Sequence, residues 1–273
     1  MENFKKEVKW LLKEKYNNKP TEQFKKDIIR LKNGEPLDYV IGFTNFLGCK
    51  IDLSKKPLIP RPETEFWVER ALKQMSHKFS TCEIYETKVL DIFSGSGCIG
   101  IAVLKHIKNS FVVFADNDKN AIKQIKINCK INNINKKRYK IIQSDVFKGL
   151  NPSSQRLLRT KYDLVFANPP YIAKTNKNII QKTVLKFEPK TALFGGGDGL
   201  FYIKKFLEQA PAFAKASSSA KATEDKSDGR GKIFMEFSPE QKKEIEKLLK
   251  KFEYKNYEFH KDQHSRWRWV FID

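Results

Sequence analysis

Asn168, Pro169, Pro170 and Tyr171 directly follow an apolar run at residues 162–167. The run is typical of a buried strand, and two prolines cannot continue it, so the chain must turn at the strand's carboxyl end. The side-chain oxygen of Asn168 and the carbonyl of Pro169 could accept hydrogen bonds from a flat, nitrogen-bearing group, while the ring of Tyr171 packs on its plane. A turn without a ligand is an equally good interpretation of these four residues alone.

A second turn, rich in small residues, lies between an expected strand at residues 89–92 and an expected helix at residues 99–107. Backbone N–H groups at the start of such a helix can approach a ligand closely. The turn lacks the Gly-Lys-Ser/Thr of a phosphate-binding loop, and a phenylalanine stands where a dinucleotide-binding turn has its first glycine. A tight turn without a ligand is therefore an alternative. The candidate binding residues are Phe93, Ser94, Gly95, Ser96 and Gly97.

Acidic residues follow the next two expected strands. Asp116 comes about twenty residues after the small-residue turn, where this class of fold places the acid that binds a ribose diol. Asp145 could accept a hydrogen bond from an adenine amino group, with Val146 and Phe147 packing on the base. A solvated loop carboxylate is the better interpretation of either acid alone. Because parallel strands end at one edge of a sheet, three such strand ends in succession predict a nucleoside site.

The order of the expected elements predicts an α/β fold, because strands that alternate with helices form a parallel sheet with right-handed crossovers. A strand, a helix and a closing strand near the C-terminus would complete the sheet with one antiparallel member. The expected strands are residues 89–92, 111–115, 139–142, 162–167, 232–237 and 266–272, and the helices are residues 99–107, 119–131 and 239–252.

Three regions are expected along the chain. Residues 1–33 have the apolar spacing of a small helical module, and residues 34–80 read as a hairpin, with extended runs within 39–52, followed by a helical connector. Residues 81–273 form the sheet domain. Within it, residues 211–231 are of low complexity and lack the apolar side chains that offset the entropy of ordering, so we expect a mobile insertion.

Composition bounds the class of function. No apolar run is long enough to cross a bilayer, and charges near the start replace the core of a signal peptide, so we expect a cytoplasmic protein. The four cysteines are scattered, and His260 and His264 lack a nearby third ligand, so no metal site is expected. The net charge of +21 and the pI of about 9.7 suit a protein that binds a polyanion. Lysine is spread through the whole chain, however, which indicates a genome-wide compositional bias.

A nucleoside site beside an amide-Pro-Pro-aromatic turn resembles the Rossmann-like S-adenosylmethionine methyltransferases that act on planar nitrogens. The flanking segments resemble one family more closely, the HemK/PrmC family of peptide chain release factor glutamine methyltransferases. The Asn-Pro-Pro-Tyr turn is shared with adenine-N6 methyltransferases, so the Pro-Arg-Pro-Glu-Thr-Glu stretch at residues 60–65 is the more discriminating match. The matching segments are residues 34–42, 58–65, 186–189 and 196–200.

The resemblance implies a class I methyltransferase sheet with a small N-terminal helical domain that docks the substrate. It also implies S-adenosyl-L-methionine as methyl donor and N5-methylation of the glutamine in the Gly-Gly-Gln motif of release factors, with no membrane and no required nucleic acid. Asn168 to Tyr171 would hold the glutamine. The cofactor would be held by residues 93–97, Asp116, Asp145, Val146 and Asn168.

Phe93 and Val146 depart from the family pattern, which more often has a small residue and an aromatic residue at these positions. Three alternatives stay open. An adenine-N6 methyltransferase of nucleic acids would share the turn and flip a base into it. A sister glutamine methyltransferase would act on a ribosomal protein. A binding protein with a degenerate nucleotide fold would not bind the cofactor.

Overall fold

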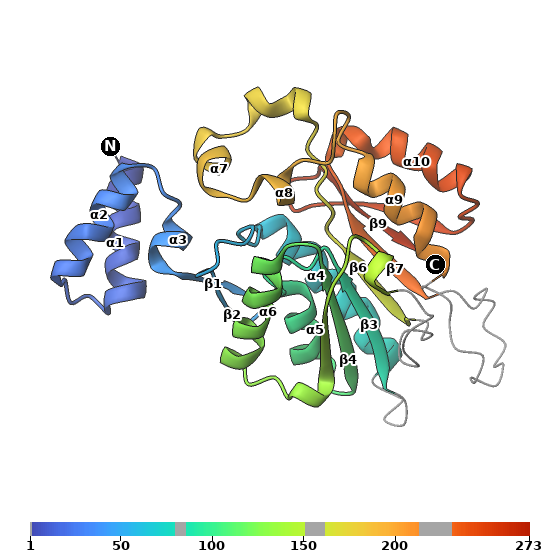
Figure 1. Cartoon of the computed structure of the whole chain (residues 1–273), viewed down its shortest axis with the longest axis horizontal. Helices are drawn as coiled ribbons and strands as arrows, with labels where there is room; N and C mark the ends of the chain where they lie inside the picture. Colours follow the sequence, from blue (N-terminus) through green and yellow to red (C-terminus); the bar gives the residue numbers. More distant parts are fainter. Residues whose placement is uncertain (1, 80–85, 151–161, 213–230) are drawn as a thin grey trace.

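A seven-stranded sheet forms the centre of the larger part of the molecule (Figure 1), in a computed structural model that describes residues 2–79, 86–150, 162–212 and 231–273. The strand order is β5-β4-β3-β6-β7-β9-β8. The first five strands of this order are parallel, and β9 is antiparallel to both β7 and β8. The strands are β3 (Thr87–Ile92), β4 (Ser110–Asp116), β5 (Tyr139–Gln143), β6 (Leu164–Ala167), β7 (Lys232–Glu236), β8 (Tyr257–Lys261) and β9 (Trp267–Ile272).

The sheet confirms the predicted α/β class and its single antiparallel member. Helices cover both of its faces: α4 (Pro62–Phe79), α5 (Cys98–His106) and α6 (Lys119–Ile131) lie against one, and α9 (Phe201–Gln209) and α10 (Lys242–Lys251) against the other (Figure 1). Successive residues of β3 divide between the two apolar clusters, so that Val89 packs with the first set of helices and Leu90 with the second. Burial on both faces explains why the strands are apolar throughout.

Short helices occupy the segment between β6 and α9, to which the sequence assigned no elements. Such pieces lack the long periodic pattern that identifies a helix in sequence. Here they bring the backbone at residues 189–196 alongside the turn after β6, with an isolated parallel bridge between Ile172 and Phe194. The short helices in this segment are η3 (Lys174–Ile179), α7 (Lys182–Phe187) and α8 (Lys190–Leu193). Elsewhere in the described sheet domain lie the 3-10 helices η1 (Lys136–Arg138), η2 (Lys148–Leu150), η4 (Ala210–Ala212) and η5 (Pro239–Gln241).

The N-terminal module contains α1 (Glu2–Tyr16), α2 (Glu22–Lys32) and α3 (Leu37–Ile41), which stand apart from the sheet in Figure 1. The extended structure expected at residues 39–41 is wrong: the segment is helical, because Val40 and Ile41 reach the apolar core between α1 and α2. Gly42 then ends α3 with a φ of 99°, and its N–H donates to Asp38 O (2.8 Å). β-branched residues favour strands only as a weak prior, which this tertiary contact overrides.

The expected hairpin is present as β1 (Phe43–Phe46) and β2 (Cys49–Asp52). Its second strand and the residues after it are bound to α6 by amide side chains. The backbone N–H of Asp52 donates to Asn128 Oδ1 (2.8 Å), and that of Lys55 donates to Gln124 Oε1 (2.8 Å). Asn132 exchanges two further bonds with the backbone of Lys50. The connector is therefore fixed to the sheet domain by specific polar contacts.

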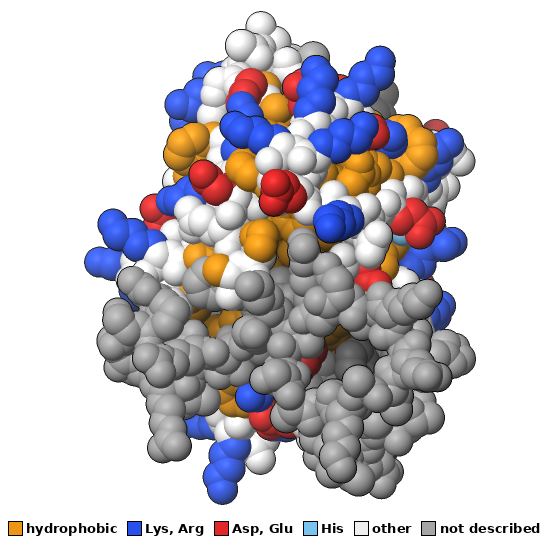
Figure 2. Space-filling view, turned by 90° about the vertical axis from the view of Figure 1, so that its right-hand side faces the viewer, with side chains coloured by type: hydrophobic (Ala, Val, Ile, Leu, Met, Phe, Trp, Pro, Cys, Tyr) orange, Lys and Arg blue, Asp and Glu red, His pale blue; other side chains and the backbone are white. Residues whose placement is uncertain are grey.

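The predicted mobile insertion falls largely on residues 213–230, which lie outside the described residues. Among the helices that are described, none combines the length and apolar character needed to cross a bilayer. Figure 2 shows one face of the molecule, on which Lys and Arg side chains of the described part are interspersed with acidic and apolar ones. Among the described residues visible on this face, the basic side chains do not gather into one stripe.

Candidate active site

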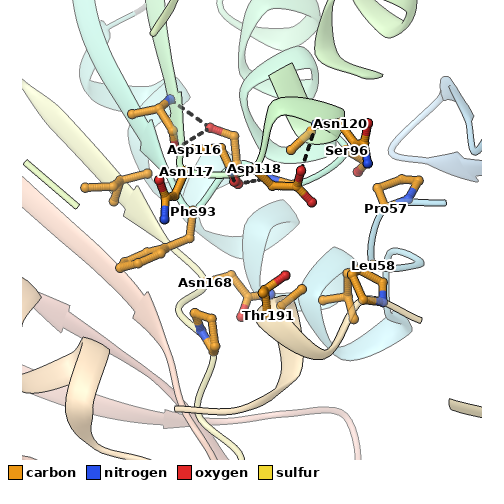
Figure 3. Close-up of a pocket in the computed structure, with 18 of the residues that line it drawn as sticks. Pro57, Leu58, Phe93, Ser96, Asp116, Asn117, Asp118, Asn120, Asn168 and Thr191 are labelled. Atoms are coloured by element: carbon orange, nitrogen blue, oxygen red, sulfur yellow. Dashed lines mark hydrogen bonds between the residues drawn. The ribbon is translucent and has the colours of Figure 1, made fainter. Parts of the chain in front are cut away.

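A cavity of about 510 Å³ opens at the carboxyl ends of β3, β4, β5 and β6 (Figure 3). The connector at residues 55–61 and the segment at residues 189–192 form its other walls. Gly97, Pro169 and Tyr171 are not among the lining residues. The residues expected from sequence that do line the cavity are Phe93, Ser94, Gly95, Ser96, Asp116, Asp145, Val146, Asn168 and Pro170.

The turn between β3 and α5 has a backbone conformation that residues other than glycine rarely adopt. Phe93, Gly95 and Gly97 all have positive φ values, of 60°, 53° and 79°. For Phe93 this conformation is strained. Its ring packs against Tyr202 (6.0 Å between ring centroids) and Phe206 (6.4 Å), and this contact offsets the strain. An apolar wall at the cavity explains why a bulky residue is accommodated at a position where a glycine was expected.

Asp91 lies beneath this turn, fully buried at the end of β3. Its Oδ2 accepts a hydrogen bond from Gly100 N (2.9 Å), while Oδ1 has no partner among the described residues. Burial disfavours the charged form and raises the pKa of Asp91 to about 8. The carboxyl group is therefore mostly protonated at neutral pH, and the charge of the site belongs to the acids that line the cavity.

Asp116 links the ends of β3 and β4. Its Oδ2 accepts a hydrogen bond from Gly95 N (2.8 Å), and its Oδ1 accepts one from Asp118 N (2.8 Å), as the dashed lines of Figure 3 show in part. Burial raises the pKa of Asp116, and the two backbone donors oppose that effect. Each oxygen keeps a lone pair for a further donor. The carboxylate thus both orders the turn and offers acceptors at the cavity wall.

The end of β5 contributes three polar residues and one apolar residue to the cavity wall: Gln143, Ser144, Asp145 and Val146. Val146 has a φ of 52° and is almost completely buried, yet it lines the cavity. Asp145 also lines it, but its Oδ2 accepts a hydrogen bond from Lys205 Nζ (2.7 Å), so part of its acceptor capacity is occupied. Phe147, expected beside a base, does not line the cavity, because its ring stacks on Phe206 (5.7 Å between ring centroids).

Asn168 stands at the wall nearest the turn after β6. Its Nδ2 donates a long hydrogen bond to Thr64 Oγ1 (3.4 Å), and its Oδ1 has no hydrogen-bond partner within the described chain. Pro169 is buried behind it. The hydroxyl of Tyr171 donates to Glu236 Oε1 (3.0 Å), and burial together with this carboxylate raises the pKa of the phenol. The turn thus offers an amide oxygen without a partner to the cavity side.

Glycines support the turn from below. Gly195 N donates to Ile172 O (2.9 Å), and Ile172 N donates to Leu193 O (3.0 Å). At Gly199 a Cβ would lie 2.3 Å from Tyr171 O, so only glycine allows this approach. The side chain of Gln241 donates to both Tyr171 O (2.9 Å) and Gly199 O (3.2 Å). Gly199, which lies in a segment found in sequence only as a family match, therefore helps to position the amide turn.

The connector wall was also missed as part of the site. Arg61 and Glu188 form an ion pair (2.6 Å), and Ile59 N donates to the second oxygen of Glu188 (3.2 Å). These contacts join the Pro-Arg-Pro-Glu-Thr-Glu stretch to the Phe-Glu-Pro stretch across about 130 positions of the sequence. Closing a loop of that length carries an entropic cost, which the ion pair and the hydrogen bond help to offset. In the sequence, both stretches were recognised only as segments that resemble the family, and no other feature indicated that they form a wall of the cavity.

The sequence of this chain is similar to those of known methyltransferases. The family described as "Methyltransferase small domain" matches residues 71–228. The release factor glutamine methyltransferase of Streptococcus pneumoniae is 31% identical over 266 residues, 96% of this chain and 84% of that protein. The protein of the same name from Fusobacterium nucleatum is 34% identical over 241 residues, 87% of this chain, and this chain spans 59% of its length.

Two solved structures share the fold. The N-terminal domain of human METTL16 in complex with SAH has a TM-score of 0.53 at 16% identity, over 82% of this chain and 75% of that one. The T. thermophilus rRNA methyltransferase RsmC, in complex with AdoMet and guanosine, has a TM-score of 0.53 at 15% identity, over 85% of this chain and 49% of that one. At these identities the likeness concerns the sheet and its helices.

Proposed function

This chain belongs to the family of release factor glutamine methyltransferases, and on that premise we propose that it transfers a methyl group from S-adenosylmethionine to the side-chain nitrogen of a glutamine in peptide chain release factors. One observation carries the proposal: Asn168 presents an amide oxygen that has no partner among the described residues, at the wall of the cavity that Phe93, Asp116 and Val146 also line. An acceptor for a carboxamide and a nucleoside-binding edge thus share one space.

The residues of the cavity suit S-adenosylmethionine, which supplies an electrophilic methyl group on a sulfonium. Asp116 offers carboxylate oxygens to the ribose diol, as acids at this strand end do in such folds. Phe93 and Val146 offer apolar surface to the adenosine part. The turn at residues 94–96 brings backbone close to the methionine part. We assign the cofactor-binding role to these residues, with Asp145 limited by its pair with Lys205.

Positioning must do most of the chemical work, because the nitrogen of a glutamine side chain is a poor nucleophile whose lone pair is delocalised into the carbonyl. Asn168 Oδ1 would accept one amide N–H bond and hold the nitrogen in line with the methyl group, and the carbonyl of Pro169, which does not line the cavity in the substrate-free protein, would have to turn toward it to accept the second. The same acceptors stabilise the positive charge that develops on nitrogen during transfer. Tyr171 closes the turn behind them, and the proton leaves to water after transfer.

We propose that the glutamine is that of the Gly-Gly-Gln motif, that the module at residues 1–33 docks the release factor, and that the reaction takes place in the cytoplasm and needs no nucleic acid. The relatives' names support the choice of partner. The direct test is mass spectrometry of a purified release factor after incubation with this protein and S-adenosylmethionine. The expected result is one added methyl group on that glutamine, and none when the glutamine is replaced by alanine.

The same assay offers DNA, RNA and ribosomal proteins in parallel, with transfer of a labelled methyl group as the readout. Methylation of an adenine would favour the nucleic-acid reading, since the Asn-Pro-Pro-Tyr turn suits a flipped base as well. Methylation of a ribosomal protein alone would redirect the proposal to that substrate. Transfer to no substrate, together with no binding of the methyl donor, would contradict enzymatic function altogether.

Asp116→Ala is expected to weaken binding of S-adenosylmethionine about 10- to 100-fold, because a hydrogen bond to a charged group contributes about 1.5–3 kcal/mol. The change also removes the acceptor of Gly95 N and Asp118 N, so the turn loses its order. Isothermal titration calorimetry gives the affinity. Asp198→Ala, at an exposed carboxylate outside the cavity, is the matched control and should bind normally. An unchanged affinity of the Asp116 variant would remove the assignment.

A further inference from the structure

A buried carboxylate lies directly behind the amide turn. Glu236 ends β7, next to β6 in the sheet, and is 1% exposed. Its Oε2 accepts hydrogen bonds from Thr64 Oγ1 (2.7 Å) and from Trp67 Nε1 (2.6 Å), and its Oε1 accepts one from Tyr171 (3.0 Å). Two segments far apart in the sequence, α4 and the turn after β6, thus converge on one side chain, which touches the cavity only through its neighbours.

The direction of each hydrogen bond in this group follows from the donors. An indole N–H can only donate, so Oε2 of Glu236 is an acceptor whether the carboxyl group is ionised or carries a proton on Oε1. With no proton on Oε2, Thr64, which lies 2.7 Å from the same oxygen, donates its single hydroxyl hydrogen to it. The lone pairs of Thr64 Oγ1 are left for Asn168.

This direction decides which end of the Asn168 carboxamide faces Thr64. The oxygen and nitrogen of an amide have nearly the same shape, so packing does not distinguish the two orientations and the hydrogen-bond network does. A hydroxyl that offers lone pairs requires Nδ2, as observed (3.4 Å). Oδ1 is then the end without a partner in the described chain.

We propose that Thr64, oriented by Glu236, is a positioning residue that keeps Asn168 Oδ1 available as the acceptor for the substrate nitrogen. The proposal rests on the proposed function, in which that oxygen binds a carboxamide N–H. In the reversed orientation Nδ2 would meet the substrate's N–H groups, and two donors cannot pair. The long contact in the substrate-free protein fits this role, because catalytic hydrogen bonds often tighten only in the complex.

A matched pair of variants tests the role of the hydroxyl. Thr64→Val keeps the shape of the side chain and removes the hydroxyl, whereas Thr64→Ser keeps the hydroxyl and removes a methyl group. We expect Thr64→Val to lower kcat about three- to tenfold at saturating substrate, the value of one net hydrogen bond, and Thr64→Ser to stay within about twofold of wild type. The affinity for S-adenosylmethionine should be the same in all three proteins.

The outcomes separate this role from a structural one. Equal losses of kcat in both variants, or a wild-type kcat in Thr64→Val, would overturn the proposal, and so would a parallel loss of cofactor affinity in Thr64→Val alone. If the wild-type protein methylates no release factor, the proposed function fails and the orientation is decided without turnover. In that case nuclear Overhauser effects between the Asn168 carboxamide protons and the Thr64 side chain support it, and their absence overturns it.

Discussion

Replacing Asn168 by alanine is expected to slow methyl transfer about 10²- to 10³-fold, the usual cost of removing one preorganised group that stabilises a transition-state charge. The alanine leaves the substrate nitrogen with one acceptor fewer and less constraint on its approach. Because the proposed ribose and adenosine contacts lie at the other walls, cofactor affinity should change little. Single-turnover rates with a release factor, together with calorimetry for S-adenosylmethionine, measure the two quantities separately.

Asn45→Ala is a suitable control, since this exposed asparagine lies in β1 and does not line the cavity. Its methyl-transfer rate should equal that of wild type. Two results would contradict the role of Asn168. A rate within a few-fold of wild type would show that its oxygen is not needed, and a parallel loss of rate and cofactor affinity would indicate damage to the cavity rather than to the reaction.

Gly199→Ala is expected to destabilise the protein by about 2–4 kcal/mol and to displace the amide turn. The added Cβ would lie 2.3 Å from Tyr171 O and 2.9 Å from Ala173 N, both backbone atoms, at a φ of +77° that is costly for alanine. A displacement of about 1 Å at a reacting group can cost about 100-fold in rate. We therefore expect the loss of rate to persist well below the unfolding temperature, where thermal unfolding and single-turnover kinetics can be compared.

Gly197→Ala provides the control from the same glycine-rich segment. A Cβ at Gly197 would meet no atom within 4 Å, and the residue is exposed. Its variant should unfold at a temperature close to that of wild type and methylate at the normal rate. If the two alanine variants behave alike, the close approach of Gly199 to the turn is not what positions Asn168.

Local pattern was enough to predict the α/β class and most strands of the sheet, but β8 and α9 were not among the expected elements. Apolar runs such as residues 162–167, each followed by a turn, indicated the strands, and α6 begins and ends at the residues expected from its periodicity. Because the strands are parallel, their ends also indicated where the cavity lies. The assignments of Asn168 and Asp116 to a reaction stay predictions, but the structure does bring both to one cavity.

Contacts between distant segments could not be predicted. Thr64 and Glu236 are hydrogen-bonded across 172 positions, and no local spacing reports such a pair. Tertiary packing also overrode the strand preference of Val40 and Ile41. These residues form a helix where a strand was expected, because their side chains pack in the core of the N-terminal helices. A small residue is expected at position 93 because only glycine adopts a positive φ without strain. The sequence pattern does not show that Tyr202 and Phe206 surround this position with aromatic rings, against which the ring of Phe93 packs.

The amide side chains of α6 have a further consequence for substrate selection. Asn128 donates to Ser96 O (2.9 Å) and to Asp52 O (3.2 Å), so one residue joins the turn after β3 to the hairpin that follows the helical module. The span between the helical module and Asn168 is therefore set within this chain itself. Under the proposed function, this fixed span favours a folded partner that contacts the helical module and places its glutamine at the turn at the same time. An isolated peptide reaches only the turn, so it gains no binding energy from the helical module.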